Sequence, residues 1–363
     1  MKRFVLDGVR SFALQEVDPP TPKRGEALLK MRKVGICGSD LHVWRTLHIG
    51  EVRIDRPLTI GHECVADVVD AGEGVERSLV GKRVAIEPAM SCGRCKWCRL
   101  GLTNVCPNVQ FLGMPPQDGA LREYMTHPAR LLEPLSDKVS DEAGVVFEPM
   151  AVALHAVNLV NAQPGQSAVI LGTGVLGTCA LELLALRGCP HIVCVDLLED
   201  RLARAARLGA TGTVKAEPGQ REEVVRRIMP LLPEGGADVV IDCAGVPETI
   251  WNMCEVAAPG GHVAVIGIDP EDRFSCRFSA ARRKGLTIRM VRRSLNTLPA
   301  CIRLTEAGLI EPERLVTHTF RASELDEAFR TVDTVSDGVL KLSLIHISEP
   351  TRPLYISYAV FCL

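Results

Sequence analysis

Net charge is almost absent from this sequence, because 42 lysine and arginine side chains face 44 aspartate and glutamate side chains, giving a formal charge of -2. This balance gives no electrostatic reason to expect a nucleic acid or a membrane surface as a partner. Apolar runs of about 18 residues, which a membrane-spanning helix requires, are also absent. A signal-peptide core is not expected, because Asp7 interrupts the apolar run after Met1-Lys2-Arg3. These absences predict a cytoplasmic protein.

A chain of 363 residues exceeds the usual size of one hydrophobic core, so two domains of roughly 150 to 200 residues are expected. The hydrophobic content of 47% and the charged content of 24% are ordinary for a globular protein. The 14 cysteines would indicate disulfides in a small secreted protein, but four of them lie close together between Cys92 and Cys106. Such clustering in a large chain favours a metal site.

The order of the predicted elements indicates an α/β protein. Short β-branched runs between glycine and proline signals, at 26–34, 63–69 and 82–86, predict a twisted, barrel-like β domain in the first half. A helix is predicted near 142–160, and after it strands alternate with amphipathic helices, as a parallel sheet requires. These strands are expected at 167–171, 191–195, 237–241, 261–266 and 285–291, and closing helices at 298–307 and 323–331.

A glycine-rich loop follows the first of these strands and opens a helix. We expect it to bind a dinucleotide through Gly172, Gly174, Val175, Leu176 and Gly177. The glycines allow a tight turn, a close approach of the backbone to a pyrophosphate, and packing of helix on strand. Asp196 ends the next strand, where a carboxylate accepts from both ribose hydroxyls and repels a 2′-phosphate, which favours NAD.

Two alternatives remain open for this loop. Arg201 is expected beside the cofactor, and together with Arg204 it lies close enough in sequence to Asp196 to keep NADP possible. The other alternative is a strand-turn-helix unit that needs glycine only for packing.

Four cysteines follow the pattern Cys-x2-Cys-x2-Cys-x7-Cys, namely Cys92, Cys95, Cys98 and Cys106. Four thiolates complete a tetrahedral zinc shell and leave no position for water, so the pattern predicts a structural zinc site. An iron-sulfur cluster uses similar spacing and is the alternative. A single four-cysteine loop on a chain that is otherwise poor in redox motifs favours zinc.

A second constellation is dispersed along the chain. Its members are Cys37, His62, Glu63 and Glu148, which occur in Gly-Ile-Cys-Gly-Ser-Asp, Gly-His-Glu and Phe-Glu-Pro. One thiolate, one imidazole and one or two carboxylates leave an open coordination position, as a catalytic zinc requires. Taken singly, such a cysteine is more often a small buried hydrophobe, and such a histidine a hydrogen-bonded core residue. Only the combination favours a metal.

The combined motifs resemble those of the zinc-containing medium-chain dehydrogenases, most of all the sorbitol, xylitol and related polyol dehydrogenases. The resemblance runs from about Met1 to Lys341 and rests on the two dispersed motifs, the four-cysteine loop, the segment 148–156 and the glycine loop. It implies a GroES-like β-barrel catalytic domain at 1–155, completed by 291–341. It also implies a Rossmann-type, doubly wound parallel sheet at 156–290 that binds NAD, two zinc ions per subunit, and a homodimer or homotetramer.

The resemblance also assigns roles to the dispersed residues. It places Cys37 and His62 on the catalytic zinc, Glu63 on zinc directly or through water, and Glu148 as a ligand or the holder of a water. Zinc then acts as a Lewis acid that lowers the pKa of a substrate hydroxyl, and a hydride passes to the nicotinamide. A non-catalytic protein that keeps the fold and the NAD site is the rival interpretation, but it would be expected to lose these ligands.

Three residues near Cys37 are expected to support the reaction. Ser39 is placed to accept the hydroxyl proton, His42 to stand at the outer end of that relay, and Asp40 to orient His62 by a hydrogen bond. A turn residue remains the alternative for Ser39, and a surface histidine the alternative for His42.

The substrate is less closely defined by these motifs. Arg293 falls where polyol dehydrogenases carry an arginine near the substrate, which favours sorbitol or xylitol. Val43 replaces a tyrosine and Arg292 an aromatic residue of the best-known sorbitol enzymes, which counts against sorbitol itself. A sugar acid such as idonate, held by both arginines, and a threonine-like amino alcohol remain alternatives.

The C-terminal residues look foreign to the rest of the chain. From Leu342 the sequence resembles a translated transposon-based sequencing adapter, and 356–363 resembles a translated flow-cell adapter. We therefore expect 342–363 to be a non-native tail outside the fold and assign no function to His346 or Cys362. A genuine apolar C-terminal strand is the alternative.

Overall fold

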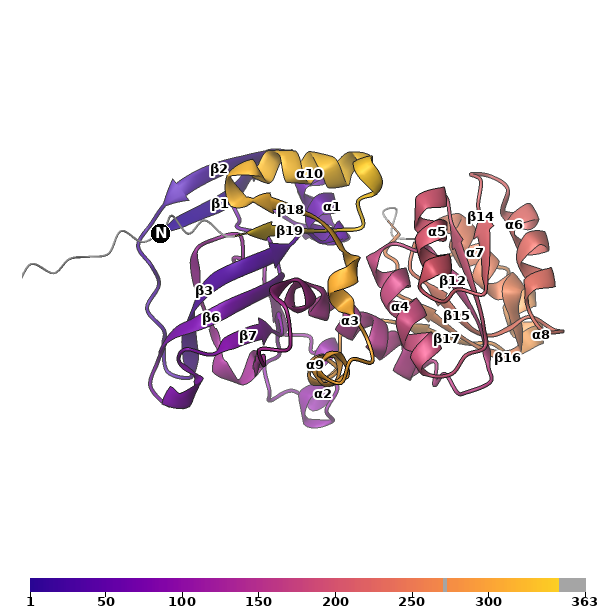
Figure 1. Cartoon of the computed structure of the whole chain (residues 1–363), viewed down its shortest axis with the longest axis horizontal. Helices are drawn as coiled ribbons and strands as arrows, with labels where there is room; N and C mark the ends of the chain where they lie inside the picture. Colours follow the sequence, from indigo (N-terminus) through magenta and orange to yellow (C-terminus); the bar gives the residue numbers. More distant parts are fainter. Residues whose placement is uncertain (270–272, 346–363) are drawn as a thin grey trace, which may run out of the picture.

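The computed structural model describes residues 1–269 and 273–345. Figure 1 shows two lobes, one built mainly of strands and one in which helices cover a sheet. Helix α3 (Asp141–Leu159) lies between them, because its apolar residues pack on the first lobe through Val65 and on the second through helix α4. Within the described ranges no helix is long and apolar enough to cross a membrane.

The first lobe is organised around a sheet of seven strands in the order β11-β7-β6-β3-β19-β18, with β10 also paired to β3. Side chains on β3 alternate between buried and partly exposed, as the sequence pattern predicts for a strand with one face on a core. The strands are β3 (Glu26–Gly35), β6 (Glu63–Ala71), β7 (Arg83–Ile86), β10 (Tyr124–Pro128), β11 (Leu132–Pro134), β18 (Val316–Arg321) and β19 (Lys341–Ile345).

Short ribbons and helices complete this lobe. The ribbons pair β1 (Lys2–Gly8) with β2 (Ser11–Glu16), β4 (His48–Ile49) with β5 (Val52–Arg53), and β8 (Ala89–Met90) with β9 (Gln110–Phe111). The α-helices are α1 (Gly38–Thr46), α2 (Lys96–Arg99), α9 (Leu298–Glu306) and α10 (Leu325–Thr334). Single 3-10 turns are η1 (Arg77–Leu79), η2 (Thr103–Val105), η3 (Ala129–Leu131), η5 (Pro312–Leu315), η6 (Ala322–Glu324) and η7 (Ser336–Gly338).

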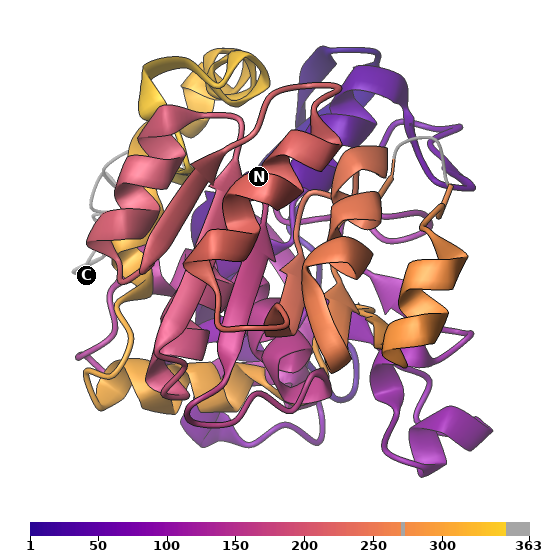
Figure 2. The ribbon, with the colours of Figure 1, turned by 90° about the vertical axis from the view of Figure 1, so that its right-hand side faces the viewer.

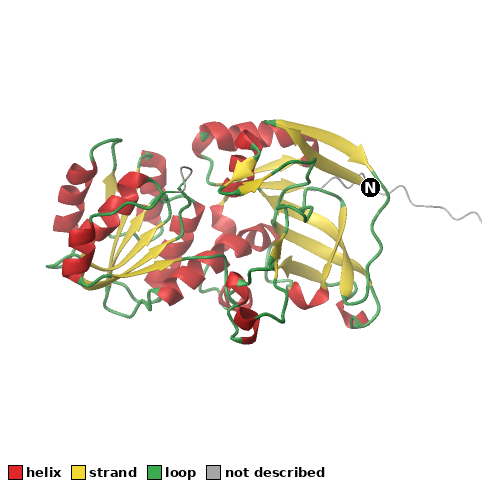
Figure 3. Ribbon diagram, turned by 180° about the vertical axis from the view of Figure 1, so that it is seen from behind, coloured by secondary structure: helices red, strands yellow, loops and turns green. Residues whose placement is uncertain are grey.

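The second lobe is a parallel sheet of six strands in the order β14-β13-β12-β15-β16-β17. Helices lie on both sides of it (Figure 3), and Figure 2 shows several of them in front of the strands. Its elements are β12 (Ser167–Leu171), α4 (Val175–Leu186), β13 (His191–Asp196), α5 (Glu199–Arg207), β14 (Gly212–Lys215), α6 (Arg221–Ile228), η4 (Met229–Leu231), β15 (Ala237–Asp242), α7 (Pro247–Val256), β16 (Ala257–Val265), α8 (Phe278–Lys284) and β17 (Thr287–Met290).

The predicted α/β class and its parallel strands are confirmed. Strands β12, β13 and β15 begin where the sequence predicts, because their buried β-branched runs match parallel strands covered on both faces. Strand β17 begins at Thr287 and not at Gly285, because Gly285 ends helix α8 in a left-handed conformation with φ 61°. Strand β12 has β13 on one side and β15 on the other, so the strand order reverses at the glycine loop.

The expectation that the chain leaves the fold at Leu342 is wrong for its first four residues. Strand β19 runs to Ile345, pairs in parallel with β18 and antiparallel with β3, and completes the sheet of the first lobe. Leu342 and Leu344 are 0% and 1% exposed. The pairing with β18 and β3 and the burial of these two side chains hold the run in the sheet, and neither depends on the origin of the residues. The remaining tail, 346–363, lies outside the described residues.

Candidate active site and metal centres

The pairing of β3 with β6 brings the dispersed motifs together. Gly35 at the end of β3 stands opposite Glu63 at the start of β6, so the residues just after β3 meet those just before β6. As a result, one donor atom each from Cys37, His62 and Glu63 lie within 4.8 Å of one another. Gly35 has no side chain to obstruct this approach, since a Cβ there would come within 2.6 Å of a carboxylate oxygen of Glu63.

Asp40 ties the two loops of this cluster to each other. Its carboxylate accepts from the backbone N–H of Cys37 at 3.1 Å and from the backbone N–H of Gly61 at 3.2 Å. It also lies 3.4 Å from Nδ1 of His62, a buried nitrogen that makes no hydrogen bond among the described residues. This contact is the one a metal-binding histidine usually makes with a carboxylate to fix its tautomer.

The carboxylate of Glu63 is divided between two neighbours. One oxygen pairs with the ammonium of Lys341, which also donates to the carbonyl of Ile36 at 3.2 Å. The other oxygen, Oε1, is buried and has no hydrogen-bond partner among the described residues. Burial alone lowers the pKa of Lys341, but the charges of Glu63 and Cys37 outweigh it and raise the pKa. A buried carboxylate oxygen without a partner indicates that a ligand belongs there.

The donor set fits zinc. A thiolate, an imidazole and a carboxylate are all zinc ligands, and three protein donors leave an open position for a substrate oxygen. Glu148 is not part of this close group. It lies on α3, where burial raises the pKa of its carboxyl to about 7 and where His62 and Glu63 exert their charges on it.

The predicted proton relay is only partly assembled. Ser39 is the second residue of helix α1 and is half-buried. His42 lies one turn further along, with its ring 5.6 Å from that of His48, and burial followed by the charges of His48 and Arg45 lowers its pKa. Among the described residues no hydrogen bond joins Ser39 to His42, so the structure leaves the relay a prediction.

The four cysteines of the predicted structural zinc site lie close together. Their sulfurs lie within 4.8 Å of one another, with Cys95 at 3.5 Å from Cys98 and 3.8 Å from Cys106. Backbone N–H groups point at these sulfurs, which lowers the pKa of Cys92 to about 6. Four sulfurs at such spacing suit a closed tetrahedral metal shell.

The glycine loop and Asp196 adopt the predicted arrangement. A Cβ on Gly177 would come within 1.9 Å of the carbonyl oxygen of Gly172, so only glycine lets helix α4 begin this close to the turn. The carboxylate of Asp196 accepts from the backbone N–H of Thr173 at 2.7 Å and from its hydroxyl at 3.0 Å. Arg201 lies 3.6 Å from the same carboxylate, so loop, acid and arginine form one connected unit.

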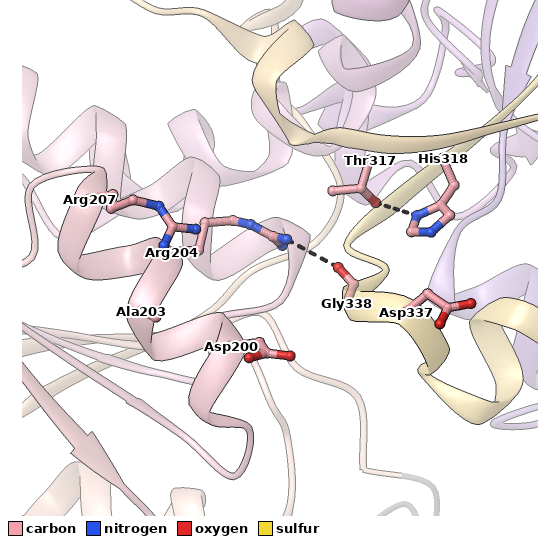
Figure 4. Close-up of a pocket in the computed structure, with 8 residues that line it drawn as sticks. All are labelled: Asp200, Ala203, Arg204, Arg207, Thr317, His318, Asp337 and Gly338. Atoms are coloured by element: carbon pink, nitrogen blue, oxygen red, sulfur yellow. Dashed lines mark hydrogen bonds between the residues drawn. The ribbon is translucent and has the colours of Figure 1, made fainter.

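Two hollows open beside this unit. One, of about 370 Å³, is lined by Arg201, Arg204 and Lys215 among others. The next, of about 380 Å³, lies between helix α5 and the segments carrying His318 and Gly338, and there Arg204 donates to the carbonyl of Gly338 at 3.1 Å (Figure 4). Neither hollow reaches the Cys37 group. Arg201 lies 3.6 Å from Asp196, and Arg204 lines the same hollow as Arg201, so NADP stays open as an alternative cofactor.

Arg293 lies one aromatic ring away from the Cys37 group. Its guanidinium carbon stands 4.6 Å from the centre of the Phe111 ring, and that ring is 5.0 Å from the ring of His62. Burial and the charge of Arg292 lower the pKa of Arg293 to about 10. Its Nη1 is buried and has no hydrogen-bond partner among the described residues.

Comparison with known families accounts for both lobes. Residues 23–137 match the alcohol dehydrogenase GroES-like domain, and residues 175–307 match the zinc-binding dehydrogenase domain. A sorbitol dehydrogenase of Arabidopsis thaliana is 33% identical over 341 residues, covering 92% of each chain. The chain belongs to the zinc-binding alcohol dehydrogenases. An L-idonate 5-dehydrogenase of Vitis vinifera is 32% identical over 330 residues, covering 90% of each chain.

A solved structure agrees with this membership in the zinc-binding alcohol dehydrogenase family. An Escherichia coli alcohol dehydrogenase complexed with NADH matches with a TM-score of 0.87 and 27% identity, over 95% of this chain and 99% of that one. The protein is therefore an oxidoreductase that uses zinc and a nicotinamide dinucleotide and acts on a small alcohol. The predicted GroES-like and Rossmann-type architecture is confirmed.

Sequence reasoning missed three residues of this zinc-binding dehydrogenase site. Lys341 ends the part of the chain that the resemblance covers, and a lone lysine between apolar neighbours is itself a signal of a buried partner. Phe111 and Asn104 carry no motif. Asn104 lies in the four-cysteine loop and Phe111 shortly after it, so only the fold brings them near Arg293.

Proposed function

We propose that this dehydrogenase transfers a hydride between NAD and a secondary hydroxyl of a polyol such as sorbitol or xylitol. This proposal rests mainly on the position of Arg293, which is separated from the Cys37 group by the ring of Phe111. A substrate whose reacting hydroxyl lies at that group would present a second hydroxyl to the unpartnered Nη1 of Arg293. Only a molecule with several polar groups uses both positions, which favours a polyol over a simple alcohol.

The protein groups divide the work as follows. Cys37, His62 and Glu63 would hold the metal, which when bound supplies Lewis-acid activation of the hydroxyl. Asp40, whose carboxylate lies 3.4 Å from Nδ1 of His62, would fix the orientation of that ring. Ser39 would take the hydroxyl proton and pass it outward toward His42, and Glu148 would hold a water or bind the metal. The second metal, in the four-cysteine loop, would be structural.

A sugar acid is the second candidate substrate. The observation that favours it is again Arg293, whose unpartnered guanidinium nitrogen suits a carboxylate as well as a hydroxyl. The carboxylates of Glu87 and Glu148 exert their charges on this arginine and offset its charge in part, which favours the neutral polyol. An amino alcohol has no specific observation in its favour.

Arg293→Leu should reduce kcat/KM for the best polyol by about 10- to 100-fold, because a hydrogen bond from a charged donor is lost in a desolvated site. The assay is NAD reduction with sorbitol, xylitol, an aldonate, threonine and 2-propanol. Arg303→Leu is the matched control, since Arg303 is exposed on helix α9 outside the segment of Arg292 and Arg293, and it should change the rate less than about twofold. Turnover of the aldonate alone would replace the polyol by the sugar acid, and turnover of 2-propanol alone would contradict both.

Cofactor choice gives a separate prediction. Asp196→Ser should raise KM for NAD by about tenfold or more and narrow the preference over NADP, because the carboxylate that accepts from ribose hydroxyls and repels a 2′-phosphate is gone. Initial rates with both cofactors measure the effect. Glu234→Ser removes an exposed carboxylate that lies in the same lobe but lines neither hollow, and it should leave the ratio unchanged. An equal ratio in Asp196→Ser and the parent protein would reject the role of Asp196.

We extend the proposal to a homodimer or homotetramer in the cytoplasm. Strand β17 is an end strand of the parallel sheet, and Met290 on it is 63% exposed. Phe278, on the preceding helix α8, is 75% exposed. Exposed apolar side chains beside an end strand are typical of a surface that a second copy covers.

A further inference from the structure

The four-cysteine loop, residues 92–106, makes a specific contact outside itself. Asn104 lies on η2, two residues before Cys106, and is 7% exposed. Its Nδ2 donates to the backbone carbonyl of Arg292 at 2.9 Å and lies 3.4 Å from Nε2 of His155. A side chain of the four-cysteine loop is thus hydrogen-bonded to the backbone directly before Arg293.

The segment that receives this contact has an unusual backbone. Arg293 has φ 55° and Asn296 has φ 54°, in the left-handed region that residues with side chains rarely adopt. Such a conformation persists only where surrounding bonds hold it. Here Ser294 donates to Glu87 at 2.9 Å and Thr297 donates to the carbonyl of Ala151 at 2.7 Å.

We propose that Asn104 is a positioning residue that fixes the backbone of Arg292 and Arg293. The four-cysteine loop would thereby orient the guanidinium of Arg293 that faces the substrate. The link to substrate rests on the proposed function of Arg293, whereas the link to the backbone does not. Ser294 and Thr297 hold the segment after Arg293, and Asn104 holds it before Arg293. The segment is therefore fixed on both sides of its first left-handed residue.

The four-cysteine loop would then do more than stabilise the fold. Holding Cys92, Cys95, Cys98 and Cys106 in place fixes η2, and η2 presents Asn104 to the substrate segment. Among the described residues, Arg293 makes no hydrogen bond through Nη1 that would orient the guanidinium by itself. Its direction is consequently set by its backbone and by the face of Phe111.

Hydrogen exchange in the full-length zinc-containing protein tests the backbone link without any substrate. Asn104→Leu keeps the size of the side chain but cannot donate, and should speed amide exchange in 292–297 by about tenfold. Asn104→Asp, which also lacks the donor, should do the same if the leucine variant folds poorly. Thr103→Val is the control, because that hydroxyl makes no hydrogen bond among the described residues. Unchanged exchange in both Asn104 variants, with zinc content equal to the parent, would overturn the proposal.

Kinetics test the link to substrate. With the polyol that the parent turns over fastest, Asn104→Leu should raise KM about tenfold and change kcat less than about twofold. The same substitution in an Arg293→Leu background should have no further effect on KM, because the group it positions is gone. A KM increase that persists in that background would overturn the positioning role. If no polyol is turned over, the proposed function fails, and the exchange experiment still decides whether Asn104 holds the segment.

Discussion

Cys37→Ser should lower kcat/KM for the best alcohol substrate by about 10³-fold or more. The thiolate is one of three donors in the proposed metal group, and a serine hydroxyl remains neutral near pH 7 and is a poor zinc ligand. Loss of the metal removes the Lewis acid that lowers the pKa of the substrate hydroxyl. Steady-state kinetics with NAD measure the effect, and elemental analysis should show that about one of the two zinc ions per chain is lost.

Cys276→Ser is the matched control for this variant. Cys276 is also a half-buried thiol, but it lies in the second lobe outside both cysteine groups. Its substitution should leave zinc content unchanged and alter activity less than about twofold. Equal turnover by Cys37→Ser and the parent protein would reject the proposed metal group, whereas loss of both zinc ions would mean that the two sites are not independent.

Lys341→Met should destabilise the zinc-free protein by about 3–5 kcal/mol relative to the zinc-free parent. Lys341 and Glu63 are 2% and 1% exposed, and removing one partner of a buried ion pair leaves the other charge without compensation. The carboxylate would also lose the contact that directs its second oxygen toward Cys37 and His62. Urea unfolding followed by circular dichroism gives the free energy, and a chelator titration gives the affinity for zinc.

Two reference variants define the meaning of that result. Lys341→Arg keeps the charge and should recover part of the lost stability. Arg77→Met breaks an exposed pair with Asp70 and should leave the free energy of unfolding almost unchanged, because solvent screens both charges. A Lys341→Met protein as stable as Arg77→Met would show that the buried pair is not what holds Glu63.

The sequence predicted those parts of the site whose chemistry is local. The glycine loop, the four cysteines and the strand ending at Asp196 are contiguous signals, and the structure brings their residues together as expected. The dispersed group was harder, because Cys37 and His62 meet only through the pairing of β3 with β6. Resemblance to a known family, and not spacing, supplied that prediction.

Contacts between distant segments were not predictable. No sequence motif predicts that Asn104 donates to the carbonyl of Arg292. None predicts that the ring of Phe111 lies between His62 and Arg293. The strand at Leu342 was missed for a different reason. The resemblance to adapter sequence concerns the origin of these residues, whereas their place in the sheet depends on the pairing with β18 and β3, which only the fold reveals.

The most direct test of zinc-dependent hydride transfer uses a polyol deuterated at its reacting carbon. We predict that NAD gains deuterium at the nicotinamide C4, that the rate falls at least about 10³-fold when zinc is removed by a chelator, and that added zinc restores it. Deuterium transfer that continues undiminished without zinc, or the absence of transfer from every polyol and aldonate in zinc-loaded protein, would contradict the account.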